Sequence, residues 1–208
     1  MAQLKINGII LYLLNHYGGY NRVIKENGAI VLFSQMPFAA ELVLSNKKMF
    51  RYEWIWEKTK AGGFLNANRM PLQAHEHLCV FYKKLPIYNP QMESGKPYIK
   101  KSVTNGDGGC YGKFERVGSV NVNSGTRYPR SVVKFANDNH GSLHTTQKPV
   151  PLLEYLIRTY TNEGETVLDN CMGSGSTGVA AKNLNRNFYG IELNEHYFEI
   201  AKNRIESA

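Results

Sequence analysis

The chain has 208 residues, of which 42% are hydrophobic and 20% are charged, and its formal net charge is +8 at pH 7. This composition is typical of a single globular domain with a substantial core. No run of 18 apolar residues occurs, which excludes a transmembrane helix, and we expect no membrane partner. Three widely spaced cysteines, Cys79, Cys110 and Cys171, exclude CxxC-type zinc sites and a disulfide framework and favour a cytoplasmic location.

The charge is unevenly distributed along the chain. Residues 1–45 carry +1, residues 46–134 carry +10 and residues 135–208 carry −3. A basic middle next to a mildly acidic C-terminal third indicates a surface that binds a polyanion, attached to a region with a different role. A solvated lysine surface would give the same numbers.

The first half of the chain predicts an alternation of strands and one helix. Gly28–Ser34 is a short continuous apolar run, typical of a strand buried on both faces. Pro37 begins a helix that runs to about Asn46, because proline is well tolerated in the first turn. Arg51–Glu57 and His77–Lys83 are rich in aromatic and aliphatic residues and are predicted to be strands.

Two pairs of side chains alternate along these strands. Trp54 and Trp56 share one face of a strand, where we expect them to pack in the core. His75 and His77 likewise share a face, with Glu76 on the other. Two histidines could bind a metal, but no third ligand follows at a fixed spacing, so we expect no metal site.

Between Tyr88 and Thr126 the regular pattern is lost. This stretch is rich in Gly, Asn, Ser and Lys and is longer than most structural connections, so we expect a loop-rich functional insertion at residues 88–127. Its basic residues are interleaved with aromatic ones, and we expect them to bind DNA by neutralising its phosphates. They are Lys96, Lys100, Lys101, Lys113, Arg116 and Arg127.

The last sixty residues give the clearest pattern. The expected elements are a helix from Pro149, a strand Glu165–Asp169, a turn Gly173–Thr177, a helix Gly178–Leu184, a strand Phe188–Glu192 and a helix Asn194–Ile205. A strand, a glycine-rich turn, a helix and a second strand ending in an acid form a βαβ unit suited to a nucleotide.

Individual residues of this unit have predicted roles. Gly173 and Gly175 allow a sharp turn and a close approach of the backbone to a ligand. Glu192 is placed to accept hydrogen bonds from two ribose hydroxyls, and Asp169 to hold a polar group at the mouth of the site. Together with Gly178 the glycines also satisfy GxGxxG, which leaves a nicotinamide oxidoreductase as an alternative. The C-terminal position of the unit disfavours that alternative.

Several motifs occur together in one order: His144-Thr-Thr-Gln-Lys-Pro149, Val167-Leu-Asp-Asn-Cys-Met-Gly-Ser-Gly-Ser-Thr177, Gly190-Ile-Glu192 and Tyr197-Phe-Glu-Ile-Ala201. This series resembles site-specific DNA amino-methyltransferases, in particular the permuted class whose catalytic motif precedes the cofactor motif. The resemblance implies a Rossmann-like α/β fold that binds S-adenosyl-L-methionine (SAM). The implied cofactor residues are Asp169, Gly173, Gly175, Thr177, Glu192, His144, Thr146, Gln147 and Lys148.

The resemblance also covers the middle of the chain and implies a different role for each of three segments. Residues 19–87 resemble the half that holds the target base, residues 88–127 the target-recognition insertion, and residues 128–208 the cofactor-binding half of one methyltransferase domain. The implied reaction is methyl transfer to the exocyclic amino group of adenine in double-stranded DNA. A cognate restriction endonuclease would be a partner, and no metal is required.

One departure from the resembled family is clear. Its catalytic tetrapeptide, Asp/Asn/Ser-Pro-Pro-Tyr/Phe, does not occur in the 208 residues, so no catalytic residue can be assigned. When residues 1–18 are back-translated with allowed codons and the DNA is read one nucleotide earlier, one possible translation resembles the segment that follows the catalytic motif in this family. We therefore hypothesise that the reading frame was broken and that translation starts at an out-of-frame Met1. The alternative function is therefore an inactive remnant that binds cofactor or DNA only.

A missing catalytic strand would have a structural consequence. In the resembled fold that strand lies centrally, between Gly28–Ser34 and Glu165–Asp169, and its loss would leave buried polar groups unpaired at about 1–3 kcal/mol each. We therefore expect a chain that either is poorly stable or uses Ile9–Leu14 to fill the position. In both cases we expect methyl transfer near background.

Overall fold

The computed structural model describes residues 9–11, 23–102, 119–137, 143 and 146–208. These fall into two compact units. The first comprises Met1–Asn89 with Arg130–Ala208, and the second is Pro90–Pro129. The second unit begins and ends two residues later than the insertion expected from the sequence.

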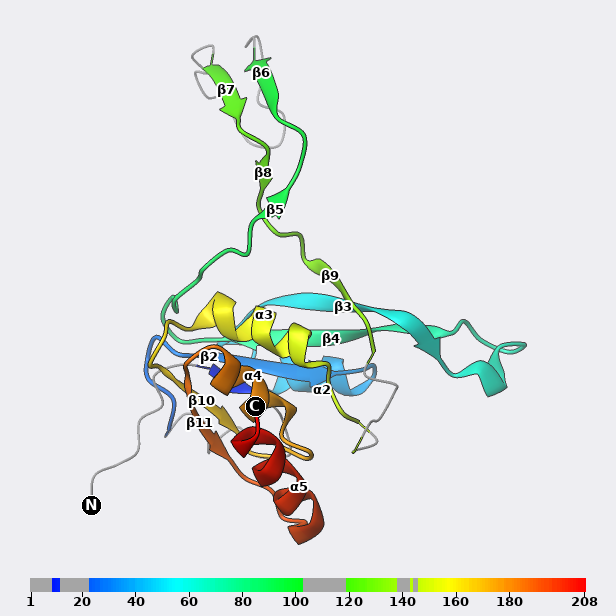
Figure 1. Ribbon diagram of the computed structural model, residues 1–208. Coiled ribbons are helices and arrows are strands. Elements are labelled where there is room, and N and C mark those ends of the chain that lie inside the picture. The colour runs from blue at the N-terminus through cyan, green and yellow to red at the C-terminus, as the bar shows by residue number, and fades with distance from the viewer. Residues whose placement is uncertain (1–8, 12–22, 103–118, 138–142, 144–145) are drawn as a thin grey trace. The chain divides into compact units, whose positions relative to one another are not determined.

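The first unit is built on a seven-stranded mixed sheet (Figure 1). In spatial order its strands are β11 (Asn187–Gly190), β10 (Thr166–Asp169), β1 (Ile9–Leu11), β2 (Ala29–Ser34), β4 (Gln73–Phe81), β3 (Phe50–Gly62) and β9 (Val132–Phe135). Neighbouring strands are parallel except that β4 runs antiparallel to both β2 and β3. The strands β11, β10, β1, β2, β3 and β9 therefore all end at the same edge of the sheet, which we call the carboxyl edge.

The position between β10 and β2 is filled by β1. Ile10 pairs with Leu168 on one side and with Ile30 on the other, both in parallel. The prediction that Ile9–Leu14 fills this position is thus confirmed for Ile9–Leu11, while residues 12–14 lie outside the described residues. The expected low stability stays a prediction.

Within the described residues the helices are α2 (Phe38–Ser45), α3 (Val150–Tyr160), α4 (Ser176–Asn183) and α5 (Glu195–Glu206), with a short 3-10 turn, η1, at Phe64–Asn66. Pro37 and Pro149 directly precede α2 and α3, where a missing N–H costs nothing. Asn194 caps α5, because its side chain accepts a hydrogen bond from the Tyr197 amide. None of the described helices is long and apolar enough to cross a membrane.

Two hydrophobic clusters cover the two faces of the sheet. On one face α3 and α4 pack against Trp54, Trp56 and other strand residues. On the other face α2 packs against a smaller cluster that includes Ile30 and Phe81. All six residues of β2 are buried, as expected for a strand covered on both sides. The expected core role of both tryptophans is confirmed, since each is only 3% exposed.

Polar atoms of this core are paired. The Tyr160 hydroxyl accepts a hydrogen bond from Nε1 of Trp54 at 2.7 Å and lies 2.8 Å from the Tyr52 hydroxyl. Nε1 of Trp56 donates to the Phe135 carbonyl at 3.0 Å. These bonds join α3 to β3, and β3 to β9, so the segments expected to hold the cofactor and the target base share one core.

The boundaries of several elements differ from the predicted ones. β3 continues to Gly62 and β4 begins at Gln73, because the two strands pair as a hairpin beyond the apolar part of their sequences. Strand β11 ends at Gly190, so Glu192 lies after the strand and not at its end. α4 begins at Ser176, directly after Gly175, instead of at Gly178.

The sequence predicted a loop-rich insertion in this region, but part of the second unit forms β-strands. It contains two small antiparallel ribbons, β5 (Glu93–Ser94) with β8 (Thr126–Arg127) and β6 (Tyr98–Ser102) with β7 (Ser119–Asn123). In β6 the consecutive Lys100 and Lys101 interrupt the alternation of apolar and polar residues, which explains why the pattern did not predict a strand there.

Candidate functional site

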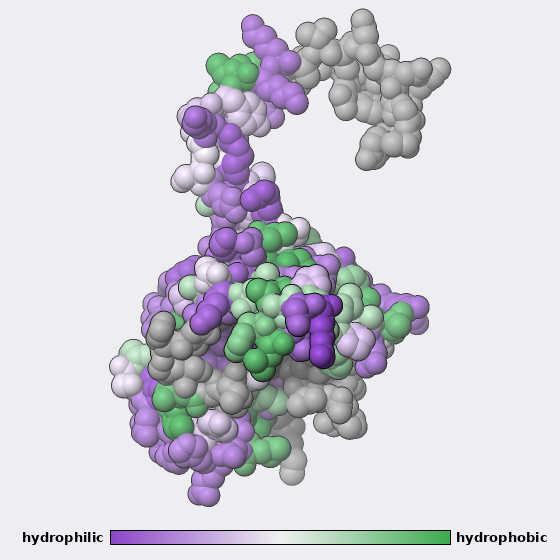
Figure 2. All heavy atoms as spheres, turned by 90° about the vertical axis from the view of Figure 1, so that its right-hand side faces the viewer, coloured by the Kyte–Doolittle hydropathy of each residue, from purple (hydrophilic) through white to green (hydrophobic). Residues whose placement is uncertain are grey.

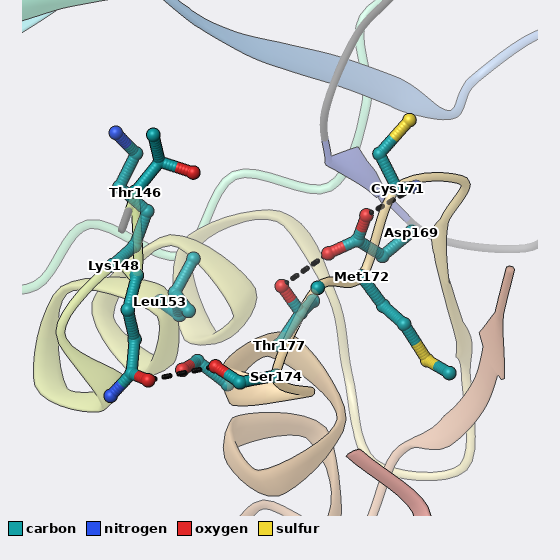
Figure 3. Close-up of a pocket in the computed structure, with 11 residues that line it drawn as sticks. Thr146, Lys148, Leu153, Asp169, Cys171, Met172, Ser174 and Thr177 are labelled. Atoms are coloured by element: carbon teal, nitrogen blue, oxygen red, sulfur yellow. Dashed lines mark hydrogen bonds between the residues drawn. The ribbon is translucent and has the colours of Figure 1, made fainter. Parts of the chain in front are cut away.

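A pocket of about 320 Å³ lies at the carboxyl edge, beyond β10 and between the first turns of α3 and α4 (Figure 3). The lining residues are Thr146, Gln147, Lys148, Leu153, Asp169, Cys171, Met172, Gly173, Ser174, Ser176 and Thr177. Six of the nine residues that the resemblance implied are thus brought together from segments more than twenty residues apart in sequence.

Asp169 supplies a buried carboxyl group to the wall of this pocket. It is 1% exposed, and its carboxyl group accepts hydrogen bonds from the Thr177 hydroxyl at 2.6 Å and the Cys171 amide at 3.0 Å. Burial raises the pKa of this carboxyl to about 7; the two hydrogen bonds lower it and the charge of Glu192 raises it further. A buried carboxyl that titrates near neutrality is typical of a functional site.

Glu192 is held by the backbone around the glycine-rich turn. Its Oε2 accepts from the Gly173 amide at 2.9 Å, and its Oε1 accepts from the Asn194 amide at 2.9 Å. A carboxylate has about four acceptor positions, so each oxygen keeps capacity for a ligand hydroxyl. Glu192 does not line the pocket itself but is fixed one hydrogen bond away from it, through Gly173.

Two glycines of the glycine-rich turn and the helix after it, Gly175 and Gly178, allow close packing between elements of the fold. Gly175 has φ +79°, and a Cβ there would lie 2.8 Å from Cβ of Ala201 in α5, so the backbone at Gly175 packs closely against this helix. A Cβ at Gly178 would collide with Ile205 and Phe188. Gly173 also has a positive φ, of +52°, and lines the pocket. Gly173 lines the pocket and Gly175 does not, and the close approach of a ligand to either glycine stays a prediction.

The segment before α3 forms the opposite wall. Oε1 of Gln147 accepts hydrogen bonds from the Ser174 hydroxyl at 2.7 Å and from the Leu143 amide at 3.1 Å. The first of these ties the segment directly to the glycine-rich turn. Thr146 and Lys148 line the pocket beside it, whereas His144 lies outside the described residues.

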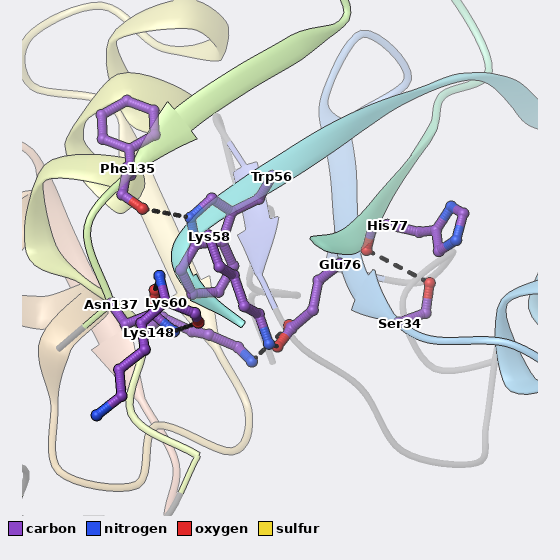
Figure 4. A network of polar contacts seen from close by, with 9 residues as sticks. All are labelled: Ser34, Trp56, Lys58, Lys60, Glu76, His77, Phe135, Asn137 and Lys148. Atoms are coloured by element: carbon purple, nitrogen blue, oxygen red, sulfur yellow. Dashed lines mark hydrogen bonds and ion pairs between the residues drawn. The ribbon is translucent and has the colours of Figure 1, made fainter. Parts of the chain in front are cut away.

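Lys148 also belongs to a buried ion cluster that the sequence did not reveal (Figure 4). Glu76 of β4 lies 2.7 Å from Nζ of Lys148 and 2.7 Å from Nζ of Lys58, and all three side chains are at most 14% exposed. Burial acts to raise the pKa of Glu76, but the two ammonium groups outweigh it and the net pKa is lowered. The ammonium of Lys148 lies over the rings of Phe33 and Trp56. The only sequence signal was a charged residue on the apolar face of β4.

A second cavity, of about 500 Å³, lies beside the end of β2 and is lined by Gln35, Met36, Gln73, His75 and His77. The two imidazole rings meet edge to face with centroids 5.3 Å apart, and Nδ1 of His77 lies 2.8 Å from Oε2 of Glu53. Among the described residues, no three His, Cys, Asp or Glu side chains gather as metal ligands would.

The basic residues of the second unit do not behave alike. Lys100 and Lys101 are exposed neighbours on β6, so their side chains leave opposite faces of the ribbon. Arg127 is engaged within the unit: it donates to the Lys96 carbonyl, contacts the Asn123 side chain, and stacks over the Tyr98 ring at 4.7 Å. Lys113 and Arg116 lie outside the described residues.

The βαβ unit, the glycine-rich turn and the pocket at the carboxyl edge define a nucleotide-binding α/β protein of the methyltransferase type. Comparison with known proteins makes this specific. The family N6_N4_Mtase, described as DNA methylase, matches residues 2–203, and the chain belongs to this family. The match includes most of residues 1–18, and the out-of-frame origin of that segment stays a prediction. Membership of this family argues against the alternative function of a nicotinamide oxidoreductase.

Individual relatives agree with the family. The chain is 31% identical over 88% of its length to the type II methyltransferase M.HindIII of Haemophilus influenzae, and 30% identical over 89% to M.HpaI of Haemophilus parainfluenzae. It spans 65% and 56% of the lengths of these two relatives. The M2.DpnII methyltransferase of Streptococcus pneumoniae is 50% identical over a shorter stretch, 31% of this chain and 24% of that protein.

Solved structures share the fold. The crystal structure of the M1.HpyAVI–SAM complex superposes with a TM-score of 0.65 at 29% identity, covering 97% of this chain and 90% of that one. The PvuII DNA methyltransferase (cytosine-N4-specific) reaches a TM-score of 0.64 at 15% identity, covering 97% and 80%, and at that identity the likeness extends to the fold alone. The Rossmann-like methyltransferase fold expected from the sequence is thus confirmed.

Proposed function

We propose that this chain is a site-specific DNA amino-methyltransferase that takes its methyl group from SAM. The observation that carries the proposal is the pocket in which Asp169 and Gly173 meet Gln147 and Lys148, in a chain of the DNA methylase family. A restriction endonuclease that recognises the same DNA sequence would be its biological partner.

The residues present fit this cofactor. Glu192 keeps acceptor capacity toward ribose hydroxyls, Asp169 supplies a buried negative charge toward a cationic group, and the Thr146–Lys148 segment forms the wall for the methionine end. Thr177 holds the carboxyl of Asp169 in place. SAM supplies an electrophilic methyl group when bound. The role of the chain's own residues is to orient this group and to exclude water around it.

We assign the acceptor as the exocyclic amino group of adenine, with the 4-amino group of cytosine as the competing acceptor. The assignment rests on overall likeness, since the tetrapeptide whose first residue usually separates the two is absent from the 208 residues. The cavity lined by Gln35, Gln73 and the two histidines offers amide and imidazole groups that suit the polar edge of a base.

We also propose the permuted order, in which the target-base half precedes the cofactor half. Strands β2, β3 and β4 come before the pocket-bearing unit β10–α4–β11 in the chain, which supports it. A basic second unit is proposed as the target-recognition element; exposed Lys96, Lys100 and Lys101 are the described residues that support this role.

A second candidate function follows from the missing tetrapeptide. The chain would bind SAM and DNA without transferring the methyl group at more than a background rate. Ile9–Leu11 completes the sheet between β2 and β10, but the sequence after it supplies no Pro-Pro turn beside the pocket.

One experiment separates these functions. The purified chain is incubated with tritiated SAM and mixed-sequence DNA from a host without methyltransferases, and SAM binding is measured in parallel by calorimetry. The DNA is then digested, and methylated nucleosides are separated by chromatography. Label in N6-methyladenine supports the assignment, label in N4-methylcytosine corrects the acceptor, and binding without label supports the second candidate. No SAM binding by the folded chain refutes both.

A further inference from the structure

The β3–β4 hairpin extends beyond its neighbours in the sheet. The pairing of β3 with β9 ends at Lys58, and the pairing of β2 with β4 ends at His77, but β3 and β4 stay paired as far as Gly62 and Gln73. The residues beyond this point, 62–72, are called the hairpin tip. In Figure 1 the tip runs out past the helices of the first unit.

The tip lies at the carboxyl edge of the sheet. β3 is parallel to β9 and antiparallel to β4, so it ends at the same edge as β2 and β10. The pocket around Asp169 opens at this edge, as does the cavity lined by Gln73 and His75. In open α/β sheets ligands bind beyond the carboxyl ends of the strands, so a DNA duplex presented to the pocket comes within reach of the tip.

Large apolar side chains are exposed on the tip. Phe64 is 76% exposed, Leu65 81%, Met70 55% and Leu72 45%. Gly63, with φ +85°, turns the chain into η1 and so places Phe64 and Leu65 at the end of the hairpin. Figure 2, which faces this side of the first unit, shows apolar and strongly hydrophilic side chains next to one another. Such clustering marks an interaction site.

The charge of the hairpin identifies the kind of partner. No Asp or Glu occurs between Glu57 and Glu76, and the exposed side chains include Lys60 and Arg69. Among the described residues neither of these two forms an ion pair. The hairpin beyond Glu57 is therefore basic, and this charge attracts the DNA backbone.

We propose that the hairpin tip enters the DNA beside the target base, with Phe64 and Leu65 inserted between bases and with Lys60 and Arg69 at the flanking phosphates. The proposal rests on the proposed function. A base can reach a methyl donor only after it leaves the stack, and apolar wedges in other DNA-binding proteins unstack and kink the duplex in this way.

The test uses a tryptophan as reporter. In the full chain, Phe64→Trp places an indole at the tip, while the two natural tryptophans are buried and give a constant background. The control is Leu85→Trp: Leu85 is also 76% exposed but follows β4 at the opposite edge of the sheet. A 30-base-pair duplex of mixed sequence is titrated while fluorescence, acrylamide quenching and anisotropy are recorded.

We expect DNA to quench the tryptophan at position 64 and to shield it from acrylamide, and to leave that at position 85 unchanged. Phe64→Ala combined with Leu65→Ala should weaken duplex binding roughly tenfold, the scale of removing one side chain on which a base stacks. Lys60→Ala with Arg69→Ala should reduce the salt dependence of binding.

Three results would overturn the proposal. Duplex binding with equal fluorescence responses at positions 64 and 85 removes the tip from the DNA interface and leaves the proposed function intact. Self-association of the wild type that the Phe64→Ala, Leu65→Ala variant loses, with unchanged DNA affinity, assigns the tip to a second copy. Absence of any duplex binding in the presence of SAM refutes this proposal and the proposed function together.

Discussion

The buried carboxyl of Asp169 predicts a pH dependence of stability opposite to that of most acidic residues. In the unfolded chain this group has an ordinary pKa of 3.8, whereas burial raises the pKa to about 7 in the folded chain. Between pH 4 and 7 the folded state therefore binds a proton that the unfolded state has released. The unfolding free energy falls as the pH rises through this window and stays constant above it.

The size of the effect follows from the two pKa values. At 1.36 kcal/mol for each tenfold change in proton affinity, the ionised carboxyl costs about 4 kcal/mol above pH 7. Asp169→Asn removes this cost while keeping the shape of the side chain. Its oxygen can still accept from the Cys171 amide, and the Thr177 hydroxyl can turn to accept from its amide group.

The assay is urea unfolding of wild type and Asp169→Asn at pH values from 4 to 8. We expect the stability of the variant relative to wild type to increase by about 4 kcal/mol across this range. Glu195→Gln, which alters an exposed side chain at the start of α5, is the control and should follow the wild-type profile. Parallel profiles for wild type and Asp169→Asn would refute the assignment of a raised pKa.

The same carboxyl should couple cofactor binding to pH. A cationic ligand favours the ionised form, so SAM affinity should increase as the pH rises from 6 to 8 in the wild type. In Asp169→Asn the affinity should be weaker and nearly independent of pH. Calorimetric titrations at pH 6, 7 and 8 measure this, and equal pH dependence in both proteins would contradict a contact between Asp169 and the cofactor.

Three further predictions concern other sites. Glu192→Ala should weaken SAM binding by about 1–3 kcal/mol, because charge-assisted hydrogen bonds are removed; an unchanged dissociation constant in the folded variant would count against its role. Glu76→Gln should lower the unfolding free energy by about 3 kcal/mol, because two largely buried ammonium groups lose their counter-charge. The control Glu57→Gln breaks an exposed ion pair and should lower it by less than about 1 kcal/mol. Equal losses for the two variants in urea unfolding would refute the predicted difference. Reversing Lys100 and Lys101 to Glu should weaken DNA binding and flatten its salt dependence, the log–log slope falling by about 0.9 for each phosphate that is no longer neutralised; a salt-independent affinity of the wild type would exclude them from the interface.

The sequence by itself determined the local elements and the class of site. The apolar run before Ser34, the prolines before α2 and α3 and the glycine-rich turn after Asp169 depend on neighbours within a few residues. Such patterns can be read from the chain because burial and turn geometry impose a period or a residue type directly. The resemblance to a known fold, together with the apolar run Ile9–Leu14, also predicted that this segment fills a position in the sheet, which β1 confirms in part.

Only the tertiary structure decided which residues meet and what their environment does to them. Glu76 and Lys148 are 72 residues apart in sequence and form one ion pair because β4 passes beside the segment before α3. Gly175 packs closely against Ala201 of α5, a contact that no local pattern predicts. The raised pKa of Asp169 arises from burial that no local pattern encodes. Packing and burial depend on distant neighbours, so these features follow from the packed fold and not from spacing along the chain.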